Sequence, residues 1–154
     1  GSITVNDTAP PPPPTQAISS TTSGVWYDPT QSGQGFMIEV LPNNVFLAVW
    51  FTFTPEGNAQ NWLYIQGNYT TGSNTITVAP VAGSARSGVL LNTGTAFPPN
   101  FDSTHITTTQ WGTMTFAFTD CTHATVNWHS LLPNYQDGSM NLVRLSEVAG
   151  LACQ

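Results

Sequence analysis

The stretch VFLAVWFTFTPEGNAQNWLYIQGNYT, residues 45–70, decides the fold class of this chain. In its first and last parts, residues 45–54 and 60–70, apolar, β-branched and aromatic side chains are enriched and alternate with polar ones. The residues between them, 55–59, include proline, glycine and asparagine, which favour turns. Two such runs joined by a short turn are typical of an antiparallel β-hairpin.

Placing Thr54 opposite Gln60 sets a register for this hairpin. One strand face then carries three aromatic rings together with neutral polar side chains: Trp50, Trp62, Tyr64, Gln60, Gln66, Thr52 and Thr54. The other face is uniformly apolar, with Val49, Phe51, Leu63 and Ile65. Because side chains alternate across a strand, a shift of one residue would exchange the two faces.

A second hairpin is predicted near the end of the chain, with its turn at residues 120–122. Pairing Thr119 with His123 gives a coherent apolar face. On this face Met114 lies opposite Trp128, Phe116 opposite Val126 and Phe118 opposite Ala124. A face of this kind predicts the core side of an antiparallel sheet.

The same alternation of apolar and polar residues extends over the chain from Gly24 onward, and no segment has a convincing helical pattern. Strand-like runs separated by turn residues fall at 24–28, 35–41, 45–54, 60–70, 75–82, 87–91, 111–119, 123–131 and 139–146. Residues 92–110 form the one long irregular connection. Consecutive strands with short turns predict an all-β fold, an antiparallel up-and-down barrel of about eight strands, with a β-sandwich as the alternative.

The first part of the chain has a different composition. Residues 1–23 contain a run of five prolines, Pro10 to Pro14, among threonines and serines, which favours an extended linker. We therefore expect a Pro-rich linker over residues 1–23, tethering a single β domain over 24–154 to a larger chain.

Charge is scarce and one-sided. Only 6% of residues are charged, the net charge is −6, and Thr, Ser, Asn and Gln make up 55 of the 154 residues. Two arginines cannot form the basic patch that nucleic acid or anionic lipid requires, so neither is an expected partner. Cys121 and Cys153 lie 32 residues apart, and a disulfide between them would contribute about 3 kcal/mol. This pattern predicts a secreted or periplasmic protein.

The aromatic face of the first hairpin is the main candidate site. Aromatic rings stack on the apolar faces of sugars, and amides and hydroxyls bind sugar hydroxyls without charge. Trp50, Trp62 and Tyr64 would supply the platform, with Gln60 and Gln66 beside it. The structural alternative is that these rings pack inside the barrel or under a neighbouring strand.

A second candidate is the glycine-rich turn of residues 24–36. Trp26, Tyr27 and Asp28 could line a ligand-binding loop at the barrel mouth, with Asp28 as an acceptor. The alternative is a structured entry turn in which Trp26 closes one end of the barrel.

Catalytic and metal-binding signals are weak, and no cofactor is expected. Most acids fall in or near turns, and Glu39 alone lies in mid-strand, where it would have to point inward to act as an acid. His123 and His129 lie too far apart along one strand to share a metal. We therefore assign no catalytic and no metal-ligating residue.

Several motifs together resemble a poorly characterised domain of secreted bacterial proteins. They are GVWYDPTQSGQGF at 24–36, FTDC at 118–121, LVRL at 142–145 and AGLAC at 149–153. The resemblance implies the extent of the domain and an extracytoplasmic location, but no activity. The fragment Gly24-Val25-Trp26 is also loosely similar to avidin and lipocalin barrels, in which an early Gly-x-Trp closes the barrel end.

These observations favour a non-catalytic module that binds a neutral ligand, with carbohydrate as the first choice. The alternatives are a small apolar molecule inside the barrel, as in lipocalins, a glycosidase-like hydrolase, and a structural or adhesive module.

Overall fold

Nine antiparallel strands form one continuous sheet that closes on itself. The computed structural model describes residues 15–153. Its strands are β1 (Gly24–Tyr27), β2 (Gly35–Leu41), β3 (Val45–Phe53), β4 (Gln60–Asn68), β5 (Thr75–Val78), β6 (Gly88–Thr93), β7 (Thr107–Phe118), β8 (His123–Ser130) and β9 (Gly138–Glu147). Short 3₁₀ helices lie at Ser20–Thr22 (η1), Pro29–Gln31 (η2) and Ser103–His105 (η3).

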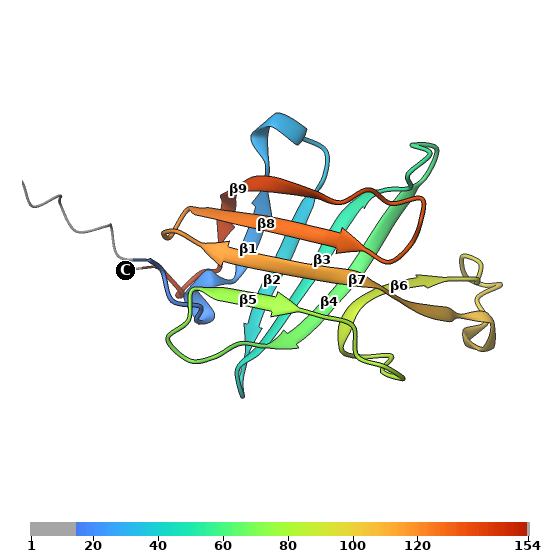
Figure 1. Ribbon diagram of the computed structural model, residues 1–154, viewed down its shortest axis with the longest axis horizontal. Coiled ribbons are helices and arrows are strands. Elements are labelled where there is room, and N and C mark those ends of the chain that lie inside the picture. The colour runs from blue at the N-terminus through green and yellow to red at the C-terminus, as the bar shows by residue number, and fades with distance from the viewer. Residues whose placement is uncertain (1–14, 154) are drawn as a thin grey trace, which may run out of the picture.

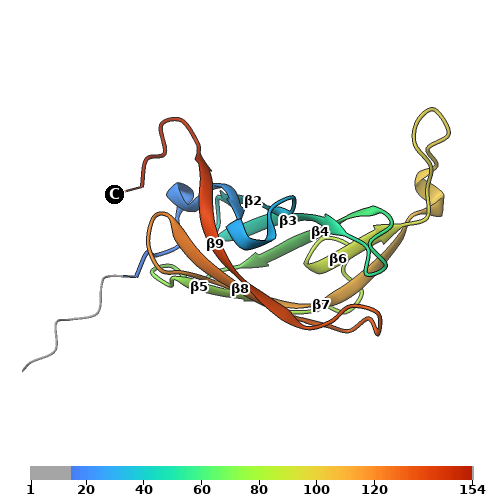
Figure 2. The same cartoon turned by 90° about the horizontal axis from the view of Figure 1, so that it is seen from above.

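The sheet is a ring of eight strands with one strand added. The order β7-β6-β4-β3-β2-β1-β9-β8 returns to β7, and β5 pairs with β7 beyond the end of β6. In Figures 1 and 2, β2 to β4 lie on one side of the barrel and β5, β7 and β8 on the other. The predicted all-β, antiparallel, barrel-like fold is confirmed.

The second hairpin has the predicted register. Met114 faces Trp128, Phe116 faces Val126, and Phe118 faces Ala124. Apart from Trp128, which is half-buried, these side chains are buried in the barrel core.

The predicted register of the first hairpin is wrong by one residue. Phe53, not Thr54, faces Gln60, and Trp50 therefore faces Leu63. The reason is the turn: the backbone N–H of Thr54 donates to the carbonyl of Ala59 at 2.9 Å, which leaves four residues in the loop rather than five. The shift places Trp50 on the same sheet face as Leu63 and Ile65, which are buried. Since side chains alternate along a strand, Trp50 therefore points into the barrel.

Strand β7 begins at Thr107, so the irregular connection after β6 is shorter than the predicted 92–110. This connection includes η3 and projects away from the barrel, in yellow at one end of the views in Figures 1 and 2. Among the described residues, no helix is long and apolar enough to cross a membrane.

The packed domain begins before the predicted boundary at residue 24. Ile18 is buried in the core, and its N–H donates to the carbonyl of Ser73 at 2.8 Å. Thr22 and Ser23 are also buried. The run Pro10 to Pro14 lies outside the described residues.

Trp26 is buried near the end of the barrel that carries the β7–β8 turn, where it packs edge to face on Phe118 with ring centres 5.4 Å apart. Its indole N–H donates to the carbonyl of Thr22 at 3.1 Å, and the Arg144 guanidinium lies 5.7 Å from the centre of its ring. Arg144 also donates to the carbonyl of Cys121 at 3.4 Å. The Cys121–Cys153 disulfide joins the C-terminal tail to this same end.

Candidate functional site

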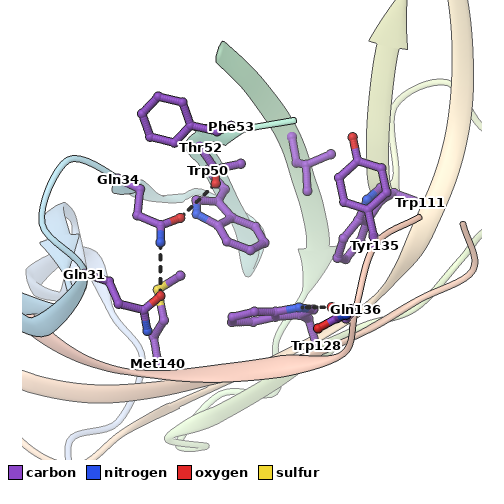
Figure 3. Close-up of a pocket in the computed structure, with 11 residues that line it drawn as sticks. Gln31, Gln34, Trp50, Thr52, Phe53, Trp111, Trp128, Tyr135, Gln136 and Met140 are labelled. Carbon is purple, nitrogen blue, oxygen red and sulfur yellow. Dashed lines mark hydrogen bonds between the residues drawn. The ribbon is translucent and has the colours of Figure 1, made fainter. Parts of the chain in front are cut away.

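A hollow of about 210 Å³ opens at the end of the barrel away from Trp26. We call it the mouth pocket; its lining residues are Gln31, Gln34, Trp50, Thr52, Phe53, Leu63, Trp111, Trp128, Tyr135, Gln136 and Met140. They come from β3, β4, β7, β8 and β9, from η2 and the residues after it, and from the β8–β9 connection (Figure 3). Closure of the barrel therefore brings together segments that are distant in sequence.

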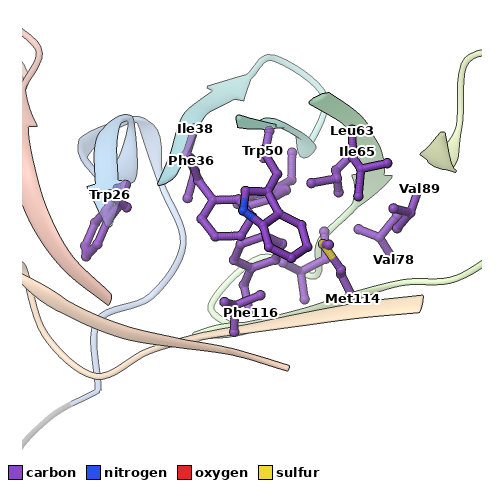
Figure 4. Packing of buried hydrophobic residues seen from close by; sticks show 14 of the residues in the cluster. Trp26, Phe36, Ile38, Trp50, Leu63, Ile65, Val78, Val89, Met114 and Phe116 are labelled. Atoms are coloured by element: carbon purple, nitrogen blue, oxygen red, sulfur yellow. The ribbon is translucent and has the colours of Figure 1, made fainter. Parts of the chain in front are cut away.

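The floor of the mouth pocket is closed by buried side chains. Trp50, Leu63 and Trp111 are 6%, 0% and 1% exposed. Beneath them Phe36 stacks on Trp50 with ring centres 5.2 Å apart, and Phe116 meets Phe36 edge to face at 5.3 Å. Figure 4 shows Trp50 above this packed interior, with Trp26 well to one side.

Two polar atoms in this floor have no hydrogen-bond partner within the described chain. They are the indole Nε1 atoms of Trp50 and Trp111. Burying an N–H group without an acceptor costs about 1–3 kcal/mol, so natural proteins rarely leave such groups unpaired. Both side chains line the mouth pocket, but the two Nε1 atoms themselves are covered by neighbouring protein atoms and are not accessible from it.

A chain of neutral hydrogen bonds forms one wall. The Thr52 hydroxyl donates to Gln34 Oε1 at 2.8 Å, and Gln34 Nε2 donates to Gln31 Oε1 at 3.2 Å (Figure 3). These bonds orient the Gln34 amide between an inward-facing strand residue and η2. Primary amides and hydroxyls can exchange such bonds for bonds to a ligand hydroxyl without any change of charge.

The opposite wall contains a tyrosine that remains neutral. Burial, together with the charge of Glu56, raises the pKa of Tyr135 above its usual value, against an opposing contribution from Asn61. Asn61 Nδ2 donates to the Tyr135 hydroxyl at 2.8 Å. Tyr135 therefore accepts one bond and keeps its own proton to donate.

Trp128 offers its ring, but not its N–H group, to the mouth pocket, because that N–H already donates a hydrogen bond. The indole Nε1 donates to the carbonyl of Gln136 at 2.9 Å (Figure 3). The ring lies 4.8 Å from that of Trp50, tilted by 54°. Gly138 lies against this ring, since a Cβ built there would come within 2.5 Å of a Trp128 ring carbon.

The predicted aromatic platform is divided by the corrected register. Trp50 points into the barrel, whereas Trp62 and Tyr64 lie on its outer surface with Gln60 and Gln66. The prediction that the three rings share one face is therefore wrong. Trp62 remains 46% exposed, and the Tyr64 hydroxyl donates to Gln66 Oε1.

The glycine-rich turn does not present its predicted residues to the mouth pocket. Asp28 is buried and caps η2: Oδ1 accepts from the hydroxyl and the backbone N–H of Thr30, which lower its pKa, and Oδ2 accepts from the N–H of Asn141. Tyr27 lines a separate groove on the outer surface, together with Met37, Phe51 and other residues. Asp28 therefore acts as a structural cap.

Acidic side chains are not part of the mouth pocket. Within the described part of the chain, the residues that line it include no aspartate and no glutamate. Glu39 is exposed on the outer side of β2. His123 and His129 each contact an aspartate, Asp120 at 3.0 Å and Asp137 at 2.7 Å, and no group of three or more metal-ligating residues occurs in residues 15–153.

Of the predicted site residues, Trp50 alone lies in the mouth pocket. The other aromatic residues there, Phe53, Trp111, Trp128 and Tyr135, were not singled out from the sequence as ligand contacts. The second hairpin had placed Trp128 on the core face at a strand end, where a large ring can line a barrel opening. In comparisons with protein-family models, with curated proteins and with solved structures, the chain has no match.

Proposed function

We propose that this chain is a secreted, non-catalytic module that binds a neutral carbohydrate in its mouth pocket. The observation that carries the proposal is the uncharged lining of this pocket, which combines the ring of Trp128 with the Gln34 amide and the Tyr135 hydroxyl. Sugar hydroxyls are acceptors as well as donors, so one sugar ring could stack on Trp128 and exchange hydrogen bonds with the Gln34 amide and the Tyr135 hydroxyl.

The composition of the pocket supports this class of ligand over the others. Aromatic rings with a few fixed polar groups are typical of small-molecule sites. The lining carries no charge, which disfavours ionic ligands. Its volume of about 210 Å³ suits a single sugar ring better than a drug-sized molecule, for which pockets of roughly 300–1,000 Å³ are usual.

The remaining alternatives have weaker support. An apolar molecule inside the barrel would compete with buried side chains such as Phe36, Phe46 and Phe116, which occupy the interior. A glycosidase requires two converging carboxyl groups, and the pocket lining supplies none from the described residues. The disulfide supports an extracytoplasmic location.

The test is titration calorimetry with a panel of neutral mono- and oligosaccharides, using the wild type, Trp128→Ala and Trp62→Ala. Trp62→Ala is the matched control, since it removes an aromatic ring from the outer surface. We expect at least one sugar to bind the wild type and Trp62→Ala, and to lose most of its affinity for Trp128→Ala. Circular dichroism would verify that each variant is folded.

Two results would overturn the proposal. Binding that depends on Trp62 and not on Trp128 would move the site to the outer strand surface. Absence of binding to every sugar in the panel would remove carbohydrate as the ligand class.

A further inference from the structure

The mouth pocket continues into a second, shallower hollow of about 350 Å³. We call this the outer hollow; it is lined by Phe53, Pro55, Asn134, Tyr135 and Gln136. Phe53, Tyr135 and Gln136 line both spaces. Because these three residues line both, the two hollows adjoin, and we refer to them together as the cleft.

Side chains bound the mouth pocket below and along one wall. The buried side chains of Trp50, Leu63 and Trp111 form its floor. The hydrogen bonds that join Thr52, Gln34 and Gln31 form one wall of the mouth pocket. The outer hollow is the adjoining space into which a chain-like ligand could extend, towards Pro55 and Asn134.

The outer hollow has the same chemistry as the pocket in a more exposed form. Phe53 is 47% exposed and presents an aromatic ring at the end of β3. Asn134 supplies a neutral amide, and Pro55 adds an apolar surface. An aromatic ring with an adjacent amide is the same combination that the mouth pocket offers with Trp128 and Gln34.

We infer that the cleft recognises the end of a neutral oligosaccharide, with the terminal sugar in the mouth pocket and the next sugar against Phe53. This inference rests on the proposed function and specifies it further. Because the buried floor blocks passage through the barrel, the end of a chain fits the mouth pocket better than an internal segment does. Sugars beyond the second lie outside the cleft.

The test is a length series titrated into the wild type: cello-, laminari-, xylo-, malto- and chito-oligosaccharides of one to six units. For the series that binds, we expect affinity to rise about tenfold, or about 1.4 kcal/mol, from one unit to two. Affinity should change little from the third unit onward. The polysaccharide of the same linkage, compared at equal mass of sugar, should compete weakly because it carries few ends.

Two phenylalanine variants locate the second sugar. Because Phe53 lines both spaces, Phe53→Ala should weaken one-unit binding as well, but it should weaken two-unit binding more and so remove most of the tenfold gain from the second unit. Phe51→Ala is the matched control, because Phe51 is 51% exposed on the same strand but lines neither space. It should match the wild type at every length.

The outcomes separate the two proposals. Equal affinity at all lengths, or two-unit binding that is insensitive to Phe53→Ala, would overturn the inference and leave sugar binding in the mouth pocket intact. Affinity that keeps rising to six units, with strong competition by the polysaccharide, would show that a chain lies across the mouth. Absence of binding by every member of every series would overturn the proposed function as well.

Discussion

Replacing the indole of Trp50 by a phenyl ring should leave the free energy of unfolding nearly unchanged, whereas the same replacement at Trp26 should lower it. Both side chains are buried, at 6% and 1% exposure, so Trp→Phe removes the same atoms from similar surroundings. Loss of packing and the resulting cavity cost about 1–2 kcal/mol at either site. What distinguishes the two sites is the hydrogen bond.

At Trp26 the N–H donates to the carbonyl of Thr22, and its loss costs about 0.5–1.5 kcal/mol. The weaker contact of a phenyl ring with the Arg144 guanidinium adds about 0.5 kcal/mol. At Trp50 the N–H is unpaired within the described chain, so its removal recovers about 1–3 kcal/mol. Trp26→Phe should therefore destabilise the protein by about 2–5 kcal/mol more than Trp50→Phe.

The measurement is urea unfolding with the disulfide intact, followed by far-ultraviolet circular dichroism, because removing a tryptophan alters the fluorescence. Trp111→Phe is a second test of the same argument, since Trp111 is 1% exposed and its N–H is also unpaired. It should behave like Trp50→Phe. If both variants cost as much as Trp26→Phe, the two N–H groups have hydrogen-bond partners in solution and this argument is refuted.

Three further predictions concern stability and site geometry. The Thr122 backbone N–H is the main cause that lowers the Asp120 pKa to about 2, so the carboxylate stabilises the fold above about pH 4 and ceases to do so as pH falls through 2. Asp120→Asn should lower the free energy of unfolding by about 1 kcal/mol at pH 7, because solvent screens this exposed group, and should not change it below pH 2. An equal loss at both pH values, measured by urea unfolding, would contradict this. Gly138→Ala should displace the Trp128 ring and weaken sugar binding in titration calorimetry, and unchanged affinity would contradict the tight packing. Replacing Cys121 and Cys153 by serine should lower the free energy of unfolding by about 3 kcal/mol, and a loss below about 1 kcal/mol would mean that the tail is held by other contacts.

The two hairpins show how far alternation predicts the barrel. The second hairpin was predicted in its correct register, because its apolar rows match across only one pairing. In the first hairpin both faces contain apolar residues, so the pattern accepts two registers that differ by one residue. The Thr54–Ala59 backbone bond decides between them, and loop closure of this kind is not encoded in hydrophobic alternation.

Hydrophobic alternation also fails to predict where β7 begins. Residues 107–110 read TTTQ, which has no apolar alternation, so the pattern predicts a loop there. They form a strand because β6 offers an edge for Thr107 to Gln110 to pair with. Backbone hydrogen bonds to a neighbouring strand stabilise polar segments that composition alone would place in a loop.

The sequence by itself determined the all-β class, the approximate number of strands, the neutral surface and the pair of cysteines, because these depend on composition and on local alternation. The tertiary structure decided the site. Trp50 faces the barrel mouth only in the observed register, and Trp111, Trp128 and Tyr135 join it only when β7, β8 and β9 close against β1 and β6. Closure depends on pairing between distant strands, and no local pattern in the chain specifies which rings meet there.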